Sequence, residues 1–360
     1  MAINNNNKYT QIKTHINSQN INLENIIIDL KGFKNNIDLS YMFNDCRNIK
    51  YLEFLEFNVE NIINMSNMFS NCISLEEIKI KFTNTTEVTN MSLIFANCIK
   101  LSNLSDISKW DTSKVTDMSG IFYNCRSLTT IDISSWNVSQ VVIMSNMFKL
   151  CSQLQLCDLN DWSTSNVTDM SCMFSDCKNI EELSNISGWD TSSVRKMNEL
   201  FDNCEKLGNI SGIKGWNTSN VTNMGYMFNN CKSLINVTSL SDWNFSNVEG
   251  MNNMFANCTK LKYLCVFKKA SNVKDISFMF YKCSSLITLK AQTPRSVEHN
   301  STFDFKFDKV KDMSFMFYKC ENLNIEEIEE KLNTQLYIAD KTCMFEGCKS
   351  MKKYNTCFII

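Results

Sequence analysis

The sequence has one proline, two histidines and nine glycines in 360 residues. It has no run of 18 or more apolar residues, so we expect no membrane-spanning helix. The opening stretch MAINNNNKYTQIKTHINSQNINLEN has no apolar core of the kind a secretory signal needs, so export by that route is not expected. A net charge of −2 and a pI near 5.9 argue against a chain-wide nucleic-acid-binding surface.

The residues needed for catalysis are equally scarce. His15 and His299 lie in non-repeated regions without a repeated acid or nucleophile partner. The sequence contains no G-x-G-x-x-G, no P-loop and no C-x-x-C pair. Two cysteine pairs are five residues apart, but neither has a histidine beside it, which disfavours zinc. We therefore predict a protein with no enzymatic activity, metal, cofactor or small-molecule substrate.

What the chain has in abundance is one repeated unit. It reads W-[DN]-x-S-x-V-x-x-M-S-x-[MI]-F-x-x-C-x-x-L, and Trp162 to Leu183 is a typical copy. A period in the twenties predicts a solenoid, in which each coil buries its apolar face against its neighbours. The cysteine of the unit falls at Cys46, Cys72, Cys98, Cys125, Cys151, Cys177, Cys204, Cys231, Cys258, Cys283, Cys320 and Cys348.

These twelve of the 17 cysteines lie between a phenylalanine and an apolar residue that is most often leucine, where a small buried hydrophobe fits. We expect reduced, buried thiols. Disulfides between adjacent coils are the geometrically conceivable alternative.

Two periodicities recur within each unit. In the fourth, Val115, Met118, Ile121, Phe122 and Cys125 follow helical spacing, which predicts a short helix. The following L-x-x-I-x-I segment, residues 128–133, predicts a short strand that pairs in parallel with its counterparts. Units 27 residues long carry one extra residue after the middle anchor of that strand. A tryptophan follows the strand in six units, and a corner residue of the core is favoured over a stacking platform for sugars or bases.

The ends of the chain depart from the repeat. Residues 1–36 are a polar segment with an apolar capping piece, and the solenoid extends over 37–320 with an insertion at 290–309. A capping helix and a degenerate repeat are expected over 321–348, before a basic tail at 349–360. Residues 260–319 hold 11 Lys and 1 Arg against 5 Asp and Glu.

The last four residues, from Cys357, resemble a C-a-a-X prenylation box, although Phe358 and Ile360 are unusual for one. One lipid chain needs a second membrane signal, which Lys349, Lys352 and Lys353 together with the basic region would supply. We therefore expect lipidation at Cys357.

In this register the repeat resembles that of the BspA-like leucine-rich repeat proteins, through copies such as Trp110 to Leu128 and Trp216 to Leu234. The resemblance implies an α/β leucine-rich-repeat solenoid of about twelve coils, each a short parallel strand plus a short helix. We expect a curved, single elongated domain. Family members occur on bacterial surfaces and in parasitic protists, where attachment and protein binding are suggested. Some protist members similarly end in a C-a-a-X box.

We expect a protein ligand to bind the outward strand positions, because the repeat leaves them free to vary. The candidates are Glu53, Glu76, Thr130, Asp132, Asp158 and Glu182. Two functions remain open: a lipid-anchored recognition or scaffold protein on the cytoplasmic face of a membrane, or an adhesin at the cell surface.

Overall fold

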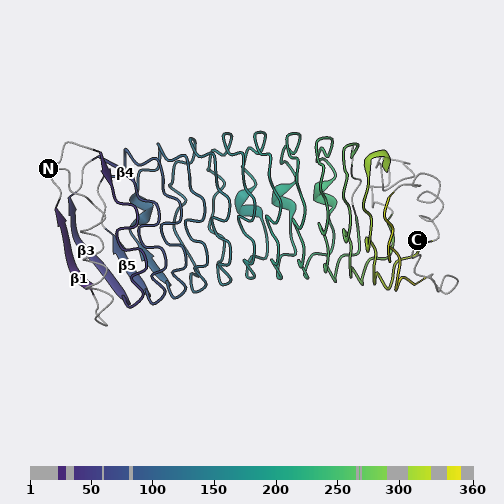
Figure 1. Cartoon of the computed structure of the whole chain (residues 1–360), viewed down its shortest axis with the longest axis horizontal. Helices are drawn as coiled ribbons and strands as arrows, with labels where there is room; N and C mark the ends of the chain where they lie inside the picture. Colours follow the sequence, from purple (N-terminus) through teal and green to yellow (C-terminus); the bar gives the residue numbers. More distant parts are fainter. Residues whose placement is uncertain are drawn as a thin grey trace. The chain divides into compact units, whose positions relative to one another are not determined.

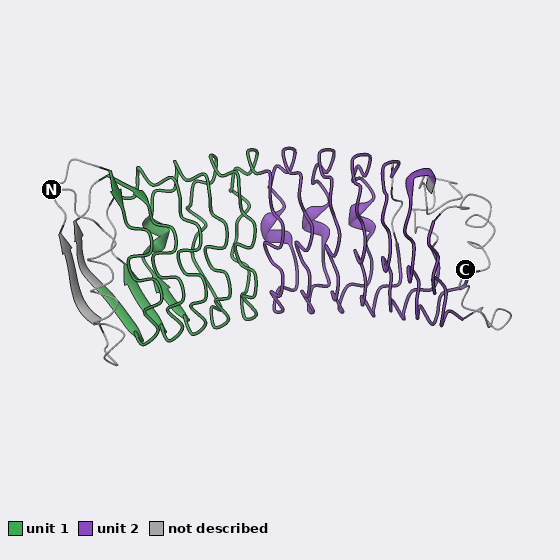
Figure 2. Cartoon of the chain, in the orientation of Figure 1, with its two compact units in different colours: residues 1–167 green, residues 168–360 purple. Residues whose placement is uncertain are grey.

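The structure of the chain is a computed structural model. It describes residues 23–29, 36–58, 61–80, 84–264, 267, 270–289, 307–325 and 339–349; for 23–29, 54–58 and 307 it describes the backbone alone. Two compact units divide the chain, unit 1 over residues 1–167 and unit 2 over residues 168–360 (Figure 2).

Each unit is a stack of coils that follow the repeat (Figure 1). In unit 1 a parallel sheet has the order β1-β3-β5-β6, formed by β1 (Leu23–Asp29), β3 (Tyr51–Asn58), β5 (Glu77–Ile80) and β6 (Asn103–Ser105). A smaller parallel pair joins β2 (Ile37–Asp38) to β4 (Ile62–Asn64). The predicted parallel strands are therefore present in the first coils.

The strand prediction is wrong for the later coils. Residues 128–133 form no strand, and the described part of unit 2 has isolated parallel bridges such as Glu182↔Asn209 and Asn236↔Tyr263 in its place. Each 27-residue unit accommodates its extra residue in a single 3₁₀ turn. These turns are η1 (Ile107–Lys109), η2 (Ser184–Ile186), η3 (Ser211–Ile213) and η4 (Thr238–Leu240), and η5 (Phe307–Lys309) precedes a later coil.

The helix prediction is also wrong: within the described residues, the M-S-x-[MI]-F-x-x-C segments are consecutive turns. Two residues four apart in each segment have positive φ, as Gly120 (57°) and Asn124 (61°) do in the fourth. A left-handed residue breaks an α-helix, and glycine and asparagine are the residues that adopt this conformation at least cost. The helical spacing of the apolar residues is real, but the backbone between them is not helical.

Hydrogen bonds between coils replace those of a helix. In the fourth segment the backbone N–H groups of Met118, Gly120, Phe122 and Asn124 donate to carbonyls of the next coil at 2.7–3.0 Å. Intervening N–H groups, such as that of Cys125, donate three residues back within the turn. Buried backbone groups are thereby paired without regular secondary structure.

Aromatic stacks fill the core. The repeated phenylalanines stack in near-parallel pairs from Phe43 to Phe148 in unit 1, with ring centroids 5.5–5.8 Å apart. Those of unit 2, from Phe174 to Phe345, lie 5.5–5.7 Å apart. The tryptophans are buried corner residues, as predicted, and Trp136 donates its indole N–H to the Ile107 carbonyl at 2.8 Å.

The repeated cysteines are buried, as predicted, and are free thiols in the structure. The Cys125 and Cys151 thiols donate to the carbonyls of Phe95 and Phe122 at 3.2 and 3.0 Å. Burial raises the pKa of Cys98 and of Cys151 to about 12. A thiolate is therefore strongly disfavoured in this column.

The predictions for the chain ends are tested only in part. Residues 1–22 and the expected capping helix at 326–338 lie outside the described residues, as does most of the 290–309 insertion. The degenerate repeat at 343–348 forms the same turn as the others, with positive φ at Cys343 and Gly347. Whether the chain forms one curved, elongated domain stays a prediction.

Replacing Asn124 tests the left-handed turn. Asn124→Ala should lower the free energy of unfolding by about 1 kcal/mol more than Asn124→Gly, because only alanine is strained at positive φ. Both variants lose the side-chain hydrogen bonds with Asn97 and Arg126, so their difference isolates the backbone. Chemical denaturation measures it. The Ala/Gly pair at exposed Thr129, where φ is not positive, is the control and should not favour glycine.

The buried thiol column should resist alkylation. At pH 8, a thiol with a pKa of about 12 is ionised in roughly one molecule in ten thousand, and it is also shielded from the reagent. Iodoacetamide should therefore modify half-buried Cys157 and Cys343 well before Cys98 and Cys151. Peptide mapping by mass spectrometry measures the order, and denatured protein is the control. Equal rates in the folded protein would contradict the thiol assignment.

Candidate functional site

The outward side of the unit 1 sheet carries an ordered set of polar side chains. On β3 and β5 the inward residues Leu52, Ile78 and Ile80 are buried, because alternate residues of a strand point to opposite sides. The outward residues are half-buried or exposed. We call this set the sheet face, and it consists of Tyr51, Glu53, Glu77, Lys79 and Asn103.

Direct contacts order the sheet face. The Tyr51 hydroxyl donates to Glu53 Oε2 at 2.5 Å, and Lys79 Nζ lies 5.4 Å from the centroid of the Tyr51 ring. Glu77 accepts a hydrogen bond from Asn103 at 3.0 Å and lies 3.8 Å from Lys79 Nζ. Register pairs Tyr51 with Glu77 and Glu53 with Lys79, so the contacts run both along and across the strands.

These contacts fix the charge state of the sheet face. The hydrogen bond to Glu53 raises the pKa of Tyr51, and interaction with Tyr51 raises the pKa of Lys79. Both shifts reinforce the ordinary state at neutral pH, in which the tyrosine is neutral and the lysine is charged. The exposed Glu77–Lys79 pair contributes at most about 1 kcal/mol to stability. Its charges remain accessible to a ligand.

The six predicted face residues are all accessible, but the structure does not bring them together. Glu53 is half-buried, while Glu76, Thr130, Asp132, Asp158 and Glu182 are exposed. No hydrogen bond or ion pair joins two of these six. Asp132 and Asp158 accept hydrogen bonds from Ser134 and Asn160 two residues later, and Glu182 belongs to unit 2.

Sequence reasoning missed the other four members of the sheet face. Tyr51 and Glu77 occupy the second position after the leucine anchor, and Lys79 occupies the fourth. Alternation around Leu52 and Ile78 was a usable signal. The alternation shows which positions point outward. It does not show which of them meet, because that depends on the register of neighbouring strands.

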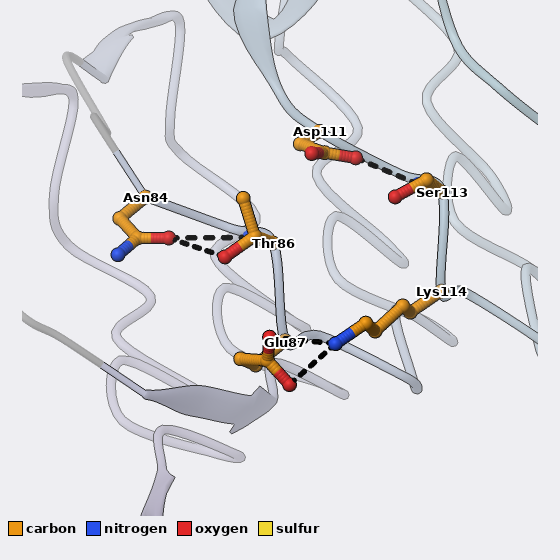
Figure 3. A network of polar contacts seen from close by, with 6 residues as sticks. All are labelled: Asn84, Thr86, Glu87, Asp111, Ser113 and Lys114. Atoms are coloured by element: carbon orange, nitrogen blue, oxygen red, sulfur yellow. Dashed lines mark hydrogen bonds and ion pairs between the residues drawn. The ribbon is translucent and has the colours of Figure 1, made fainter.

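A second polar network lies at the corner that follows the sheet, also in unit 1 (Figure 3). Lys114 Nζ pairs with both Glu87 carboxylate oxygens at 2.6 and 2.7 Å. Asp111 accepts the Ser113 N–H at 2.9 Å, and hydrogen bonds from Ser113 lower the pKa of this aspartate. Asn84 makes the equivalent contacts with Thr86 in the preceding coil. Because the Asp111 and Asn84 pairs recur with the repeat, they account for turn structure.

The described residues show no constellation for chemistry. They include no group of three or more His, Cys, Asp and Glu placed to hold a metal ion. No helix in the described part of the chain is long and apolar enough to cross a membrane. Both histidines lie outside that part. Lys349 is exposed, while Lys352, Lys353 and Cys357 are not described, so the lipidation prediction stays untested.

Solved structures similar to the chain are leucine-rich repeat proteins. A leucine rich cell surface protein from Faecalibacterium prausnitzii shares 15% identity, with 84% of this chain and 87% of that chain covered and a TM-score of 0.39. A leucine-rich repeat protein from Eubacterium ventriosum shares 14% identity over 86% and 79% of the two chains, with a TM-score of 0.34. One from Bacteroides ovatus shares 15% over 75% and 78%, with a TM-score of 0.29. At such values they carry no inference about ligands.

No curated protein of known function matches the chain. A family model does, in overlapping stretches at residues 37–155, 99–206, 178–290 and 269–357. The overlap of the matched stretches agrees with a repeated sequence; the protist-type and C-a-a-X assignments stay expectations. The matched stretches cover most of the chain, which therefore belongs to the family described as "Mycoplasma protein of unknown function, DUF285".

Proposed function

We propose that the chain is a non-enzymatic protein-binding protein and that the sheet face of unit 1 contacts the ligand. The observation that carries this proposal is the ordered contact set of Tyr51, Glu53 and Lys79 on an outward surface. The core does not depend on these three residues, because the two strands bury other side chains, among them those of Leu52 and Ile78. Their arrangement is available for recognition.

The chemistry of the sheet face suits a protein surface. Tyr51 offers a rigid ring and a hydroxyl, and tyrosine is enriched at the energetically dominant positions of interfaces. Charges of both signs lie within a few ångströms, so a ligand with the complementary pattern is favoured and one with like charges is rejected. Because contacts hold the side chains before binding, less conformational entropy is lost on association.

Membrane anchoring through Cys357 is a second part of the proposal. It would place the protein on the cytoplasmic face of a membrane, with Lys349, Lys352 and Lys353 as the electrostatic signal. A lipid chain and basic residues together give stable attachment where either alone is marginal. The alternative is an adhesin at the cell surface that contacts host or matrix proteins. Both alternatives retain a protein ligand and differ in compartment.

The sheet face is tested by a triple variant, Tyr51→Ala, Glu53→Gln and Lys79→Gln. Proteins retained from a native lysate by wild type should lose at least tenfold of their signal with this variant, since ring and charges are removed together. Quantitative mass spectrometry measures retention, and titration calorimetry with a purified retained protein gives the dissociation constant. The control is Glu87→Gln with Lys114→Gln, which removes an exposed ion pair of the same unit. Equal retention by wild type and the triple variant would refute the sheet face as the binding surface.

Anchoring is tested by Cys357→Ser in cells that express the full chain. The wild type should sediment with membranes and the serine variant should remain in the supernatant, because serine accepts no prenyl group. Lys349→Glu, Lys352→Glu and Lys353→Glu together should also release the protein. Identical partitioning of wild type and Cys357→Ser rules out the lipid anchor. Antibody labelling of intact cells would instead favour the adhesin.

A further inference from the structure

Two neighbouring coils of unit 2 carry aromatic residues on the outside of their turn segments. Phe278 and Tyr281 belong to the segment at 276–283, and Phe315 and Tyr318 occupy the equivalent positions at 313–320. All four rings are half-buried, whereas the core phenylalanines of the same segments are fully buried. We call these four rings, together with Lys282 and Lys319, the aromatic–lysine platform.

The platform has a compact and regular geometry. Phe278 stacks on Phe315 with centroids 4.8 Å apart, and Tyr281 stacks on Tyr318 at 5.2 Å. Along each coil the phenylalanine and tyrosine centroids are 5.5 and 5.6 Å apart. The four rings therefore form a nearly square cluster that is held in place by its own contacts.

Lysines complete the platform. Lys282 Nζ lies 4.9 Å from the Tyr281 centroid, and Lys319 Nζ lies 5.3 Å from that of Tyr318. Both lysines are exposed, and neither forms an ion pair with a described carboxylate. Asp275 and Asp312, the acidic residues at the start of the same coils, accept hydrogen bonds from Ser277 and Ser314 in their own turns.

These two coils differ from the coil before them at three positions of the turn segment. The preceding segment, residues 251–258, has Asn253, Ala256 and Asn257 at the positions of phenylalanine, tyrosine and lysine. Asn253 and Asn257 both have positive φ, a conformation that asparagine tolerates well. Phe278, Lys282, Phe315 and Lys319 adopt the same positive φ of 56–57° without that tolerance. The turn therefore gains nothing from these substitutions; what sets the two coils apart is that the substituted rings stack on one another.

The chemistry of the platform selects an anionic ligand with apolar groups. Stacked rings present their edges to solvent, and ring edges carry the positive end of the aromatic quadrupole. The ammonium groups add to that positive potential. Single-stranded nucleic acid needs open ring faces on which bases stack, and here neighbouring rings and lysines cover the faces. Half-buried rings also cannot insert deeply into a bilayer.

We propose that the aromatic–lysine platform binds a short extended segment of a partner protein that combines acidic with apolar residues. In an extended chain, side chains on one side are about 6.6 Å apart. The sides of the aromatic square, 4.8–5.6 Å, are somewhat shorter, so two alternate apolar side chains span the cluster while neighbouring carboxylates reach Lys282 and Lys319. The inference shares with the proposed function only that the ligand is a protein, and it concerns a different surface in unit 2.

The test uses the full chain and a reverted variant that carries the residues of 251–258 in both coils. Its substitutions are Phe278→Asn, Tyr281→Ala, Lys282→Asn, Phe315→Asn, Tyr318→Ala and Lys319→Asn. Because asparagine suits the positive φ, its conformational gain offsets part of the lost ring stacking, and the variant should still unfold in one cooperative transition, which thermal denaturation checks. A phage library of random dodecapeptides is selected on wild type and depleted on the reverted variant.

The surviving peptides should be rich in acidic and apolar residues. Synthetic fluorescent copies should bind wild type at least tenfold more tightly than the reverted variant in anisotropy titrations, and added salt should weaken binding. A variant with only Lys282→Asn and Lys319→Asn should lose the preference for acidic over neutral copies. Selected peptides without acidic enrichment, or equal binding to wild type and reverted variant, would overturn the proposal.

Two further measurements keep the alternatives apart. Unlipidated wild type that sediments with phosphatidylcholine–phosphatidylserine vesicles, while the reverted variant does not, would assign the platform to an anionic membrane and overturn the protein-segment proposal. The sheet-face variant with Tyr51→Ala, Glu53→Gln and Lys79→Gln should bind the selected peptides as wild type does. A negative result for the platform therefore does not count against the sheet-face proposal, and a negative result for the sheet face does not count against the platform.

Discussion

Hydrogen bonding between the turn segments of adjacent coils is the constraint on which the rest of each unit depends. Alternate N–H groups donate to the next coil, and this requires a left-handed residue at two positions of every segment. Equivalent residues are then held about one coil apart, so that phenylalanine stacks on phenylalanine and cysteine follows cysteine. The core is repetitive because the backbone geometry leaves each side chain only its own counterpart as a neighbour.

This constraint explains which features were predictable from the sequence. The buried thiols, the tryptophan corners and the repeat class follow from spacing, because each residue type recurs at a fixed step and a core needs such recurrence. The helix prediction failed although the apolar spacing was correct. Hydrophobic periodicity reports which side chains face inward, and a chain of turns with positive φ at Gly120 and Asn124 matches that spacing as well as a helix does. Recurring asparagine in the segment was the signal against a helix.

The strand prediction failed for a related reason. Hydrophobic spacing does not report whether the backbone after the cysteine extends, and the 27-residue units close a 3₁₀ turn there, as at Ser211–Ile213. Unit length alone does not settle it either: β5 of a 26-residue unit pairs with β6 of a 27-residue unit, whereas residues 128–133 of another 26-residue unit form no strand. The candidate sheet face was predictable only in part. The sequence shows that Glu53 points outward, but the contacts among Tyr51, Glu53 and Lys79 depend on the register between strands.

A repeat protein of this kind separates stability from recognition by position. Inward residues are so constrained by their counterparts that a change in one coil disturbs the next, and turn residues are constrained by φ. Information about a ligand can therefore accumulate only at outward positions, and there it appears as a departure from the repeat. The aromatic–lysine platform satisfies this condition, because Phe278 and Phe315 occupy left-handed positions that asparagine fills at lower conformational cost. Left-handed residues outside the Asn/Gly preference also occur in other coils, so the stacked rings with their adjacent lysines mark this surface, and not the backbone conformation alone. Exposure is shared by every outward residue of the stack, whereas two pairs of stacked outward rings with adjacent lysines occur together at these two coils.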